Sequence, residues 1–75
     1  MKIRGHQIIV RSLVPPIADL HYFAKVLIIF DDESRRHMAE VYGETHAEAY
    51  AKAEREYQEW VRNGAKLSEL PPFNA

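Results

Sequence analysis

The sequence predicts a small α+β domain, a three-stranded antiparallel meander followed by one C-terminal amphipathic helix packed on one face, in the order β-β-β-α. Three observations carry this prediction. Two segments rich in branched apolar residues flank a proline pair, a third follows a polar turn, and a capped run of helix formers ends at Asn63-Gly64. We expect residues 1–64 to form a single small domain and residues 65–75 an extended C-terminal tail.

The first strand is expected over residues 7–14, because branched apolar side chains suit a pleated surface and Pro15-Pro16 cannot continue a sheet ladder. Residues 15–20 are then a connection with at most one short turn of helix. Residues 21–30 are apolar on both faces, which is typical of a central strand covered on both sides. The polar turn of residues 31–34 joins this strand to a third one over residues 35–42, as in a β-hairpin.

The helix is expected over residues 47–62. Thr45 and Glu48 have the spacing of a capping box, Asn63-Gly64 is a C-terminal stop signal, and Gly43 allows a sharp bend out of the sheet. At 100° per residue, the apolar side chains, among them Trp60, fall on one face and the charged ones on the other. Glu54 lies close to the apolar face, so we expect it to need a cationic or hydrogen-bonding partner if it is buried.

One helix cannot cover both faces of such a sheet. If it covers the face of Tyr22, Ala24, Val26, Ile28 and Phe30, an apolar row remains on the other: Ile9, Leu13, Phe23, Leu27 and Ile29. The opposite assignment leaves a comparable row. We therefore expect a homodimer or another protein partner on this row or on a strand edge, with Trp60 at its rim. In the alternative, the tail with Leu67, Leu70 and Phe73 folds back over the row and the protein is a monomer.

Composition favours binding over catalysis. The 75 residues hold 10 Lys+Arg, 11 Asp+Glu and no cysteine, for a formal net charge of −1. The four histidines lack metal-ligand spacing, and no phosphate-binding glycine loop or catalytic triad pattern is present. The acidic residues 31–33 are interpreted as turn formers in water. We expect no enzyme activity, no cofactor and no metal; because the N-terminus lacks the apolar core of a signal peptide and no apolar run could span a membrane, we expect a cytoplasmic location.

Nucleic-acid binding is the alternative function. Arg35, Arg36 and His37, together with Lys25 and Arg11, are expected to form a basic strip on the sheet, with Tyr22 or Phe23 nearby. Such a strip would contact phosphates.

The junction before the helix reads Val41-Tyr42-Gly43-Glu44-Thr45-His46-Ala47-Glu48-Ala49, a strand end followed by G-x-T-x-x-E-A and an amphipathic helix. This pattern, which covers about the second half of the chain, resembles the core of HicB-type antitoxin domains, sheet-and-helix modules that bind and neutralise a partner toxin. It is also similar to the arm-type DNA-binding domain of phage integrases. The resemblance implies the fold and transfers no binding residue. It suits a small regulator or inhibitor of the kind found among bacterial and phage accessory genes.

Overall fold

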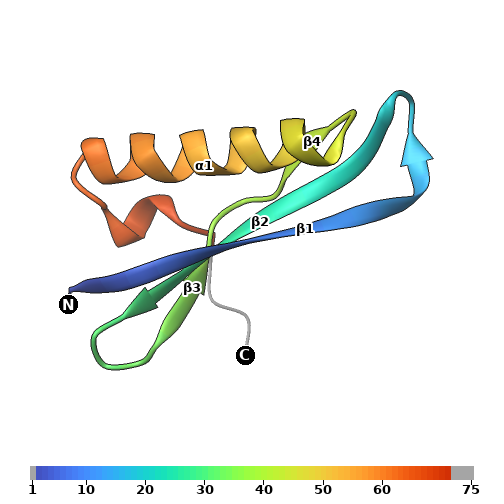
Figure 1. The fold of residues 1–75 in the computed structure, drawn as a ribbon. Coiled ribbons are helices and arrows are strands. Elements are labelled where there is room, and N and C mark those ends of the chain that lie inside the picture. The colour runs from blue at the N-terminus through green and yellow to red at the C-terminus, as the bar shows by residue number, and fades with distance from the viewer. Residues whose placement is uncertain (1, 72–75) are drawn as a thin grey trace.

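The computed structural model describes residues 2–71, in which a twisted four-stranded antiparallel sheet carries one long helix on one face (Figure 1). The elements, in chain order, are β1 (Ile3–Ile17), β2 (Leu20–Phe30), β3 (Arg35–His37), β4 (Val41–Gly43), α1 (His46–Arg62) and the short 3-10 turn η1 (Leu67–Glu69). β2 is central: β1 pairs along one side, and β3 and β4 pair along the other. The predicted α+β class and C-terminal helix are confirmed.

The predicted third strand is interrupted by a β-bulge. Leu27 pairs with His37 and Ala24 pairs with Val41, so three steps along β2 match four along the opposite chain. The extra residue divides the strand into β3 and β4. Met38 and Val41 both pack against the core, while Glu40 between them reaches Lys25 on the other face. A strand of unbroken alternation would turn one of the two apolar side chains outward.

Residues 15–20 differ from the prediction of a loop with a helical turn. β1 runs through both prolines to Ile17, which pairs with Leu20, and Ala18-Asp19 form a two-residue hairpin turn in which Ala18 has φ 52°. Prolines are tolerated here because, among the described strands, β1 pairs only with β2 and so has a free edge. We call residues 13–20 the arm.

The helix covers the β2 face that carries Ala24, Val26, Ile28 and Phe30. These side chains form one buried cluster with the helix residues Ala49, Ala53, Tyr57 and Trp60. Gly43 sits at the tightest point: a Cβ there would lie 2.6 Å from the backbone nitrogen of Ala49. Its lack of a side chain allows β4 and the first turn of α1 to approach each other.

Both helix ends follow the sequence signals. The Thr45 hydroxyl accepts a hydrogen bond from the Glu48 backbone N–H at 3.1 Å, as a helix N-cap does. At the other end the Gly64 N–H donates to the Val61 carbonyl and the Ala65 N–H donates to the Trp60 carbonyl. Gly64 has φ 103°, which glycine adopts readily.

The described part of the tail, residues 65–71, packs on the helix side of the sheet. The Trp60 indole N–H donates to the Lys66 carbonyl at 2.9 Å, and Leu70 is 7% exposed within the core cluster. Arg36 also donates to the Pro71 carbonyl at 3.0 Å. These residues therefore leave the opposite sheet face uncovered, whereas Phe73, expected to help cover it, lies outside the described residues.

Candidate association surface

We call the sheet face turned away from α1 the outer face. Successive side chains of a strand point to opposite faces of a sheet. The residues that alternate with the core residues along each strand therefore belong to the outer face. Eleven paired positions belong to it: Gly5, Gln7, Ile9 and Arg11 on β1, Phe23, Lys25, Leu27 and Ile29 on β2, and Arg35, His37 and Tyr42 on β3 and β4. α1 and Leu70 pack on the other side of the sheet (Figure 1).

Four of the six predicted contact residues meet on this face. Ile9, Phe23 and Ile29 are half-buried, and Leu27 at 9% exposure is the best covered. Leu13 is half-buried and begins the irregular stretch between Ser12 and Ile17, so no register pair fixes its direction. The face therefore has an apolar centre that runs mainly along β2.

Trp60 is a correction to the predicted set. It lies in the core on the helix side with 6% of its surface exposed, and its one polar atom is hydrogen-bonded to the Lys66 carbonyl. The amphipathic pattern that places it on the apolar helix face also removes it from any rim of the outer face.

The predicted basic strip is only partly assembled. Arg11, Lys25, Arg35 and His37 share the outer face. Arg36 does not, because alternation pairs it with Ile28 on the helix side, where it is half-buried against the Pro71 carbonyl. The Lys25 ammonium lies 3.3 Å from a Glu40 carboxylate oxygen, which neutralises one of the three charges.

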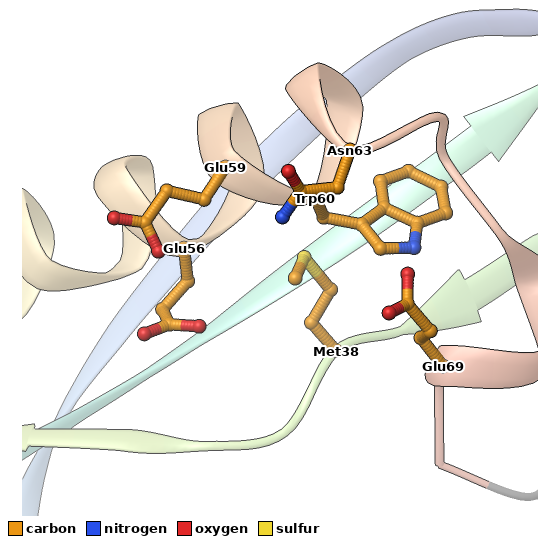
Figure 2. Close-up of a pocket in the computed structure, with 6 residues that line it drawn as sticks. All are labelled: Met38, Glu56, Glu59, Trp60, Asn63 and Glu69. Atoms are coloured by element: carbon orange, nitrogen blue, oxygen red, sulfur yellow. The ribbon is translucent and has the colours of Figure 1, made fainter.

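The helix side carries the opposite charge pattern. A shallow hollow that is open to solvent lies beside Trp60. Figure 2 shows Glu56 and Glu59 reaching down from α1 and Glu69 rising from η1 around the indole and Met38. Three carboxylates repel a polyanion, so this hollow does not suit phosphate groups.

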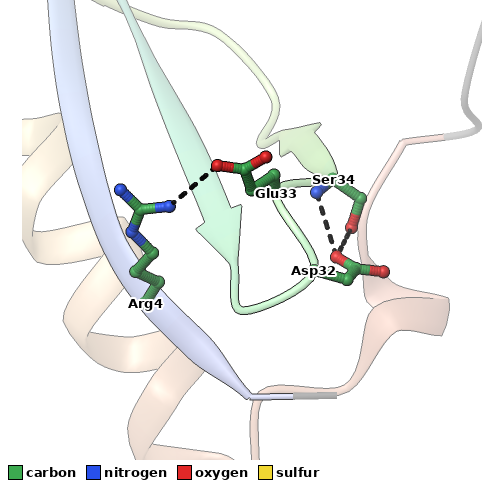
Figure 3. A network of polar contacts seen from close by, with 4 residues as sticks. All are labelled: Arg4, Asp32, Glu33 and Ser34. Atoms are coloured by element: carbon green, nitrogen blue, oxygen red, sulfur yellow. Dashed lines mark hydrogen bonds and ion pairs between the residues drawn. The ribbon is translucent and has the colours of Figure 1, made fainter.

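The acidic residues between β2 and β3 build a turn. The Asp32 carboxylate accepts hydrogen bonds from the Ser34 hydroxyl and from the Ser34 backbone N–H, and these bonds lower the pKa of Asp32 (Figure 3). Glu33 has φ 69° and its carboxylate lies 3.5 Å from the Arg4 guanidinium. Both carboxylates thus have local partners in an exposed hairpin.

Glu54 has the partner that the sequence called for. The His6 Nε2 atom lies 2.9 Å from a Glu54 carboxylate oxygen, and the His6 ring stacks on Tyr57 at 3.7 Å between ring centroids. The His6 hydrogen bond holds the pKa of Glu54 below its ordinary value, and burial raises the pKa of Tyr57. This cluster fastens the edge strand β1 to α1.

The arm is an exposed apolar surface that the sequence pattern did not predict. Val14 is 85% exposed and Ile17 is 58% exposed, the two highest values among the large hydrophobic residues that the structure describes. The usable signal was an apolar residue on each side of Pro15-Pro16, where a solvated loop ordinarily carries polar residues.

Within residues 2–71, no three histidine, aspartate or glutamate side chains lie close enough together to hold a metal ion. In the same range, no helix combines the length and apolar character required to cross a membrane. No protein-family model, curated protein or solved structure matches this chain.

Proposed function

We propose that this chain is a non-enzymatic association module whose outer face packs against a second copy. One observation carries the proposal: the strand register gathers Ile9, Phe23, Leu27 and Ile29 on the sheet face opposite α1. Apolar side chains on a sheet face are stabilised when a second layer covers them, at roughly 25 cal/mol per Å² of apolar surface buried.

A dimer of this kind fits a small regulator or inhibitor, of the type encoded by bacterial or phage accessory genes, that acts on a larger protein in the cytoplasm. Support for this role comes from the size of the module and from the G-x-T-x-x-E-A junction that resembles HicB-type antitoxin domains. The proposed contact residues are Ile9, Leu13, Phe23, Leu27 and Ile29.

Light scattering after size-exclusion chromatography tests the dimer. We expect the parent at twice 8.7 kDa and the Ile9→Lys/Phe23→Lys variant at one chain mass, because two buried ammonium groups at the interface oppose packing. Both sites are half-buried in the single chain, so the lysines can extend to solvent and circular dichroism should be unchanged. Tyr50→Lys, on an exposed helix position, is the control and should remain dimeric. A parent that stays monomeric at high micromolar concentration contradicts the proposal.

Nucleic-acid binding is the second candidate, favoured by the register that places Arg11, Lys25, Arg35 and His37 beside Phe23 on one face. It predicts salt-dependent binding to an oligonucleotide that weakens in Arg11→Ala/Arg35→Ala but not in Arg62→Ala at the helix end. Salt-independent or absent binding eliminates this candidate and leaves the association module untouched.

A further inference from the structure

We infer that the arm, residues 13–20, belongs to the same interface, and that the arms of two copies lie side by side at one end of the dimer. This inference rests on the proposed function. It assigns a contact to the most exposed apolar segment among the described residues.

The arm is apolar yet packs on little of its own chain. Val14, Pro15, Pro16 and Ile17 are all exposed, and none belongs to the core cluster. Figure 1 shows the hairpin projecting past the beginning of α1. The helix that covers the rest of the sheet therefore leaves this end bare.

The chain has a larger exposed surface area and a larger radius of gyration than a compact chain of the same mass. A compact chain of 8.7 kDa exposes roughly 4,700 Å², whereas this chain exposes 5302 Å². Its radius of gyration is 12.9 Å, against roughly 11.3 Å for a compact domain of this length. A two-stranded arm that extends from a small body contributes to both values.

A second copy as the occupant would bury the same face and arm on both chains, so these residues must supply the interface by themselves. A standard interface uses about 20–30 residues on each side. The outer face supplies only the eleven paired positions defined above, and the eight residues of the arm bring the total close to that minimum. A dimer through the outer face alone would be small, whereas face and arm together come close to the size of a specific interface.

The polarity of the two sheet ends selects the direction of the two-fold axis. An axis in the plane of contact and across the strands reverses the strand direction, so the apolar arm of each chain would lie at the end of its partner that carries the exposed acidic turn of residues 31–33. An axis along β2 stacks β2 on its own copy and β1 on the partner's β3 and β4 edge, where Glu40 and Tyr42 offer Arg11 a carboxylate and an aromatic ring. The second arrangement places both apolar arms at the same end, and it sets Lys25, which is paired with Glu40 of its own chain, near its copy.

Two measurements test the inference. The Val14→Asp/Ile17→Asp variant should raise the dissociation constant of the dimer at least tenfold in sedimentation equilibrium, with the single-chain fold intact by circular dichroism. The control is Tyr50→Asp/Val61→Asp, which adds the same charge at two exposed helix positions and should leave the constant within threefold. Because the chain has no cysteine, Ile17→Cys should form a disulfide-linked dimer on mild oxidation at low protein concentration, and Val61→Cys should not.

The outcomes separate the two proposals. A dimer that requires Ile9 and Phe23 but tolerates the arm substitutions, with no cross-link through position 17, overturns the arm inference and retains the proposed function. Loss of affinity in the arm variant without the cross-link overturns the side-by-side placement. A parent chain that is monomeric overturns both.

Discussion

Gly43 sets how closely the helix approaches the sheet. Its position leaves no room for a methyl group, since a Cβ would meet both the backbone nitrogen and the Cβ of Ala49. The sequence predicted a bend at this glycine, and the structure adds a packing requirement. Position 43 must therefore allow both a backbone bend and a close approach to Ala49, and fewer residue types meet both requirements than meet the requirement of a turn alone.

Gly43→Ala should lower the free energy of unfolding by about 1–3 kcal/mol, the usual cost of forcing extra atoms into a packed contact. Urea denaturation followed by circular dichroism measures it. Gly5→Ala is the matched control, because a Cβ there meets nothing within 4 Å. Equal effects of the two substitutions would show that close packing at Gly43 is not the cause.

The His6–Glu54 pair makes stability depend on acid pH. The pKa of Glu54 is lowered in the folded chain, chiefly by the His6 hydrogen bond, so its ionised form stabilises the fold above its ordinary value of 4.5. That contribution is lost as the pH falls through the lowered pKa. Glu54→Gln should therefore lose less unfolding free energy than the parent when the pH falls below 4.5. We expect the difference to be less than about 1 kcal/mol, since the Glu54 side chain is 38% exposed.

Denaturation midpoints between pH 7 and pH 3 provide the measurement for this effect. Glu56→Gln, an exposed position on the same helix, is the control and should keep the acid slope of the parent. Parallel pH profiles for Glu54→Gln and the parent would show that the pair contributes nothing.

At the scale of elements, helix α1 depends on its first turn. Thr45 supplies a side-chain cap at the N-terminus of α1, because its hydroxyl accepts a hydrogen bond from the Glu48 N–H. Thr45→Ala should cost about 1 kcal/mol of unfolding free energy, while Thr45→Ser, which keeps the hydroxyl, should cost much less. Thermal unfolding compares them. Similar losses in both variants would assign the effect to the methyl group of Thr45 instead.

The bulge between β3 and β4 makes a prediction about chain length. Deletion of Ala39 should leave the fold intact, because it removes the one extra residue and keeps Met38 and Val41 facing the core and Glu40 facing Lys25. Deletion of Lys25 should unfold the chain, since a one-residue slip in β2 turns half its core side chains outward. Amide hydrogen exchange distinguishes the two deletions. An unfolded Ala39 deletion would show that the bulge itself is required.

At the scale of the whole molecule, dimerisation predicts that stability depends on concentration. A dimer whose formation is linked to folding gains about 2.7 kcal/mol for each hundredfold rise in protein concentration. Because the two chains of the dimer share this gain, it corresponds to a rise of the melting temperature by roughly five to ten degrees for chains of this size. Scanning calorimetry over that range measures it, and Ile9→Lys/Phe23→Lys should melt at one temperature throughout. A parent with the same flat behaviour argues against the dimer.

The sequence by itself determined the helix, the central strand and the division of the sheet into two faces. These follow from local chemistry: the Thr45 cap, the Asn63-Gly64 stop and the alternation along β2 act within a few residues. Local chemistry also predicted that Glu54 needs a polar partner, because it lies near the apolar helix face. The structure shows that His6 is this partner.

Only the tertiary structure decided where β1 ends, where the third strand breaks and which side Arg36 faces. Each depends on what the neighbouring segment offers. Pro15 and Pro16 can stay in β1 because its outer edge is free among the described strands. Met38 and Val41 both face inward because both pack against the core under α1. Arg36 faces the helix side, where it donates a hydrogen bond to the Pro71 carbonyl. Local propensity carries no information about these long-range contacts. The sequence alone therefore predicts a loop over residues 15–20, an unbroken strand over residues 35–42 and a basic triplet over residues 35–37.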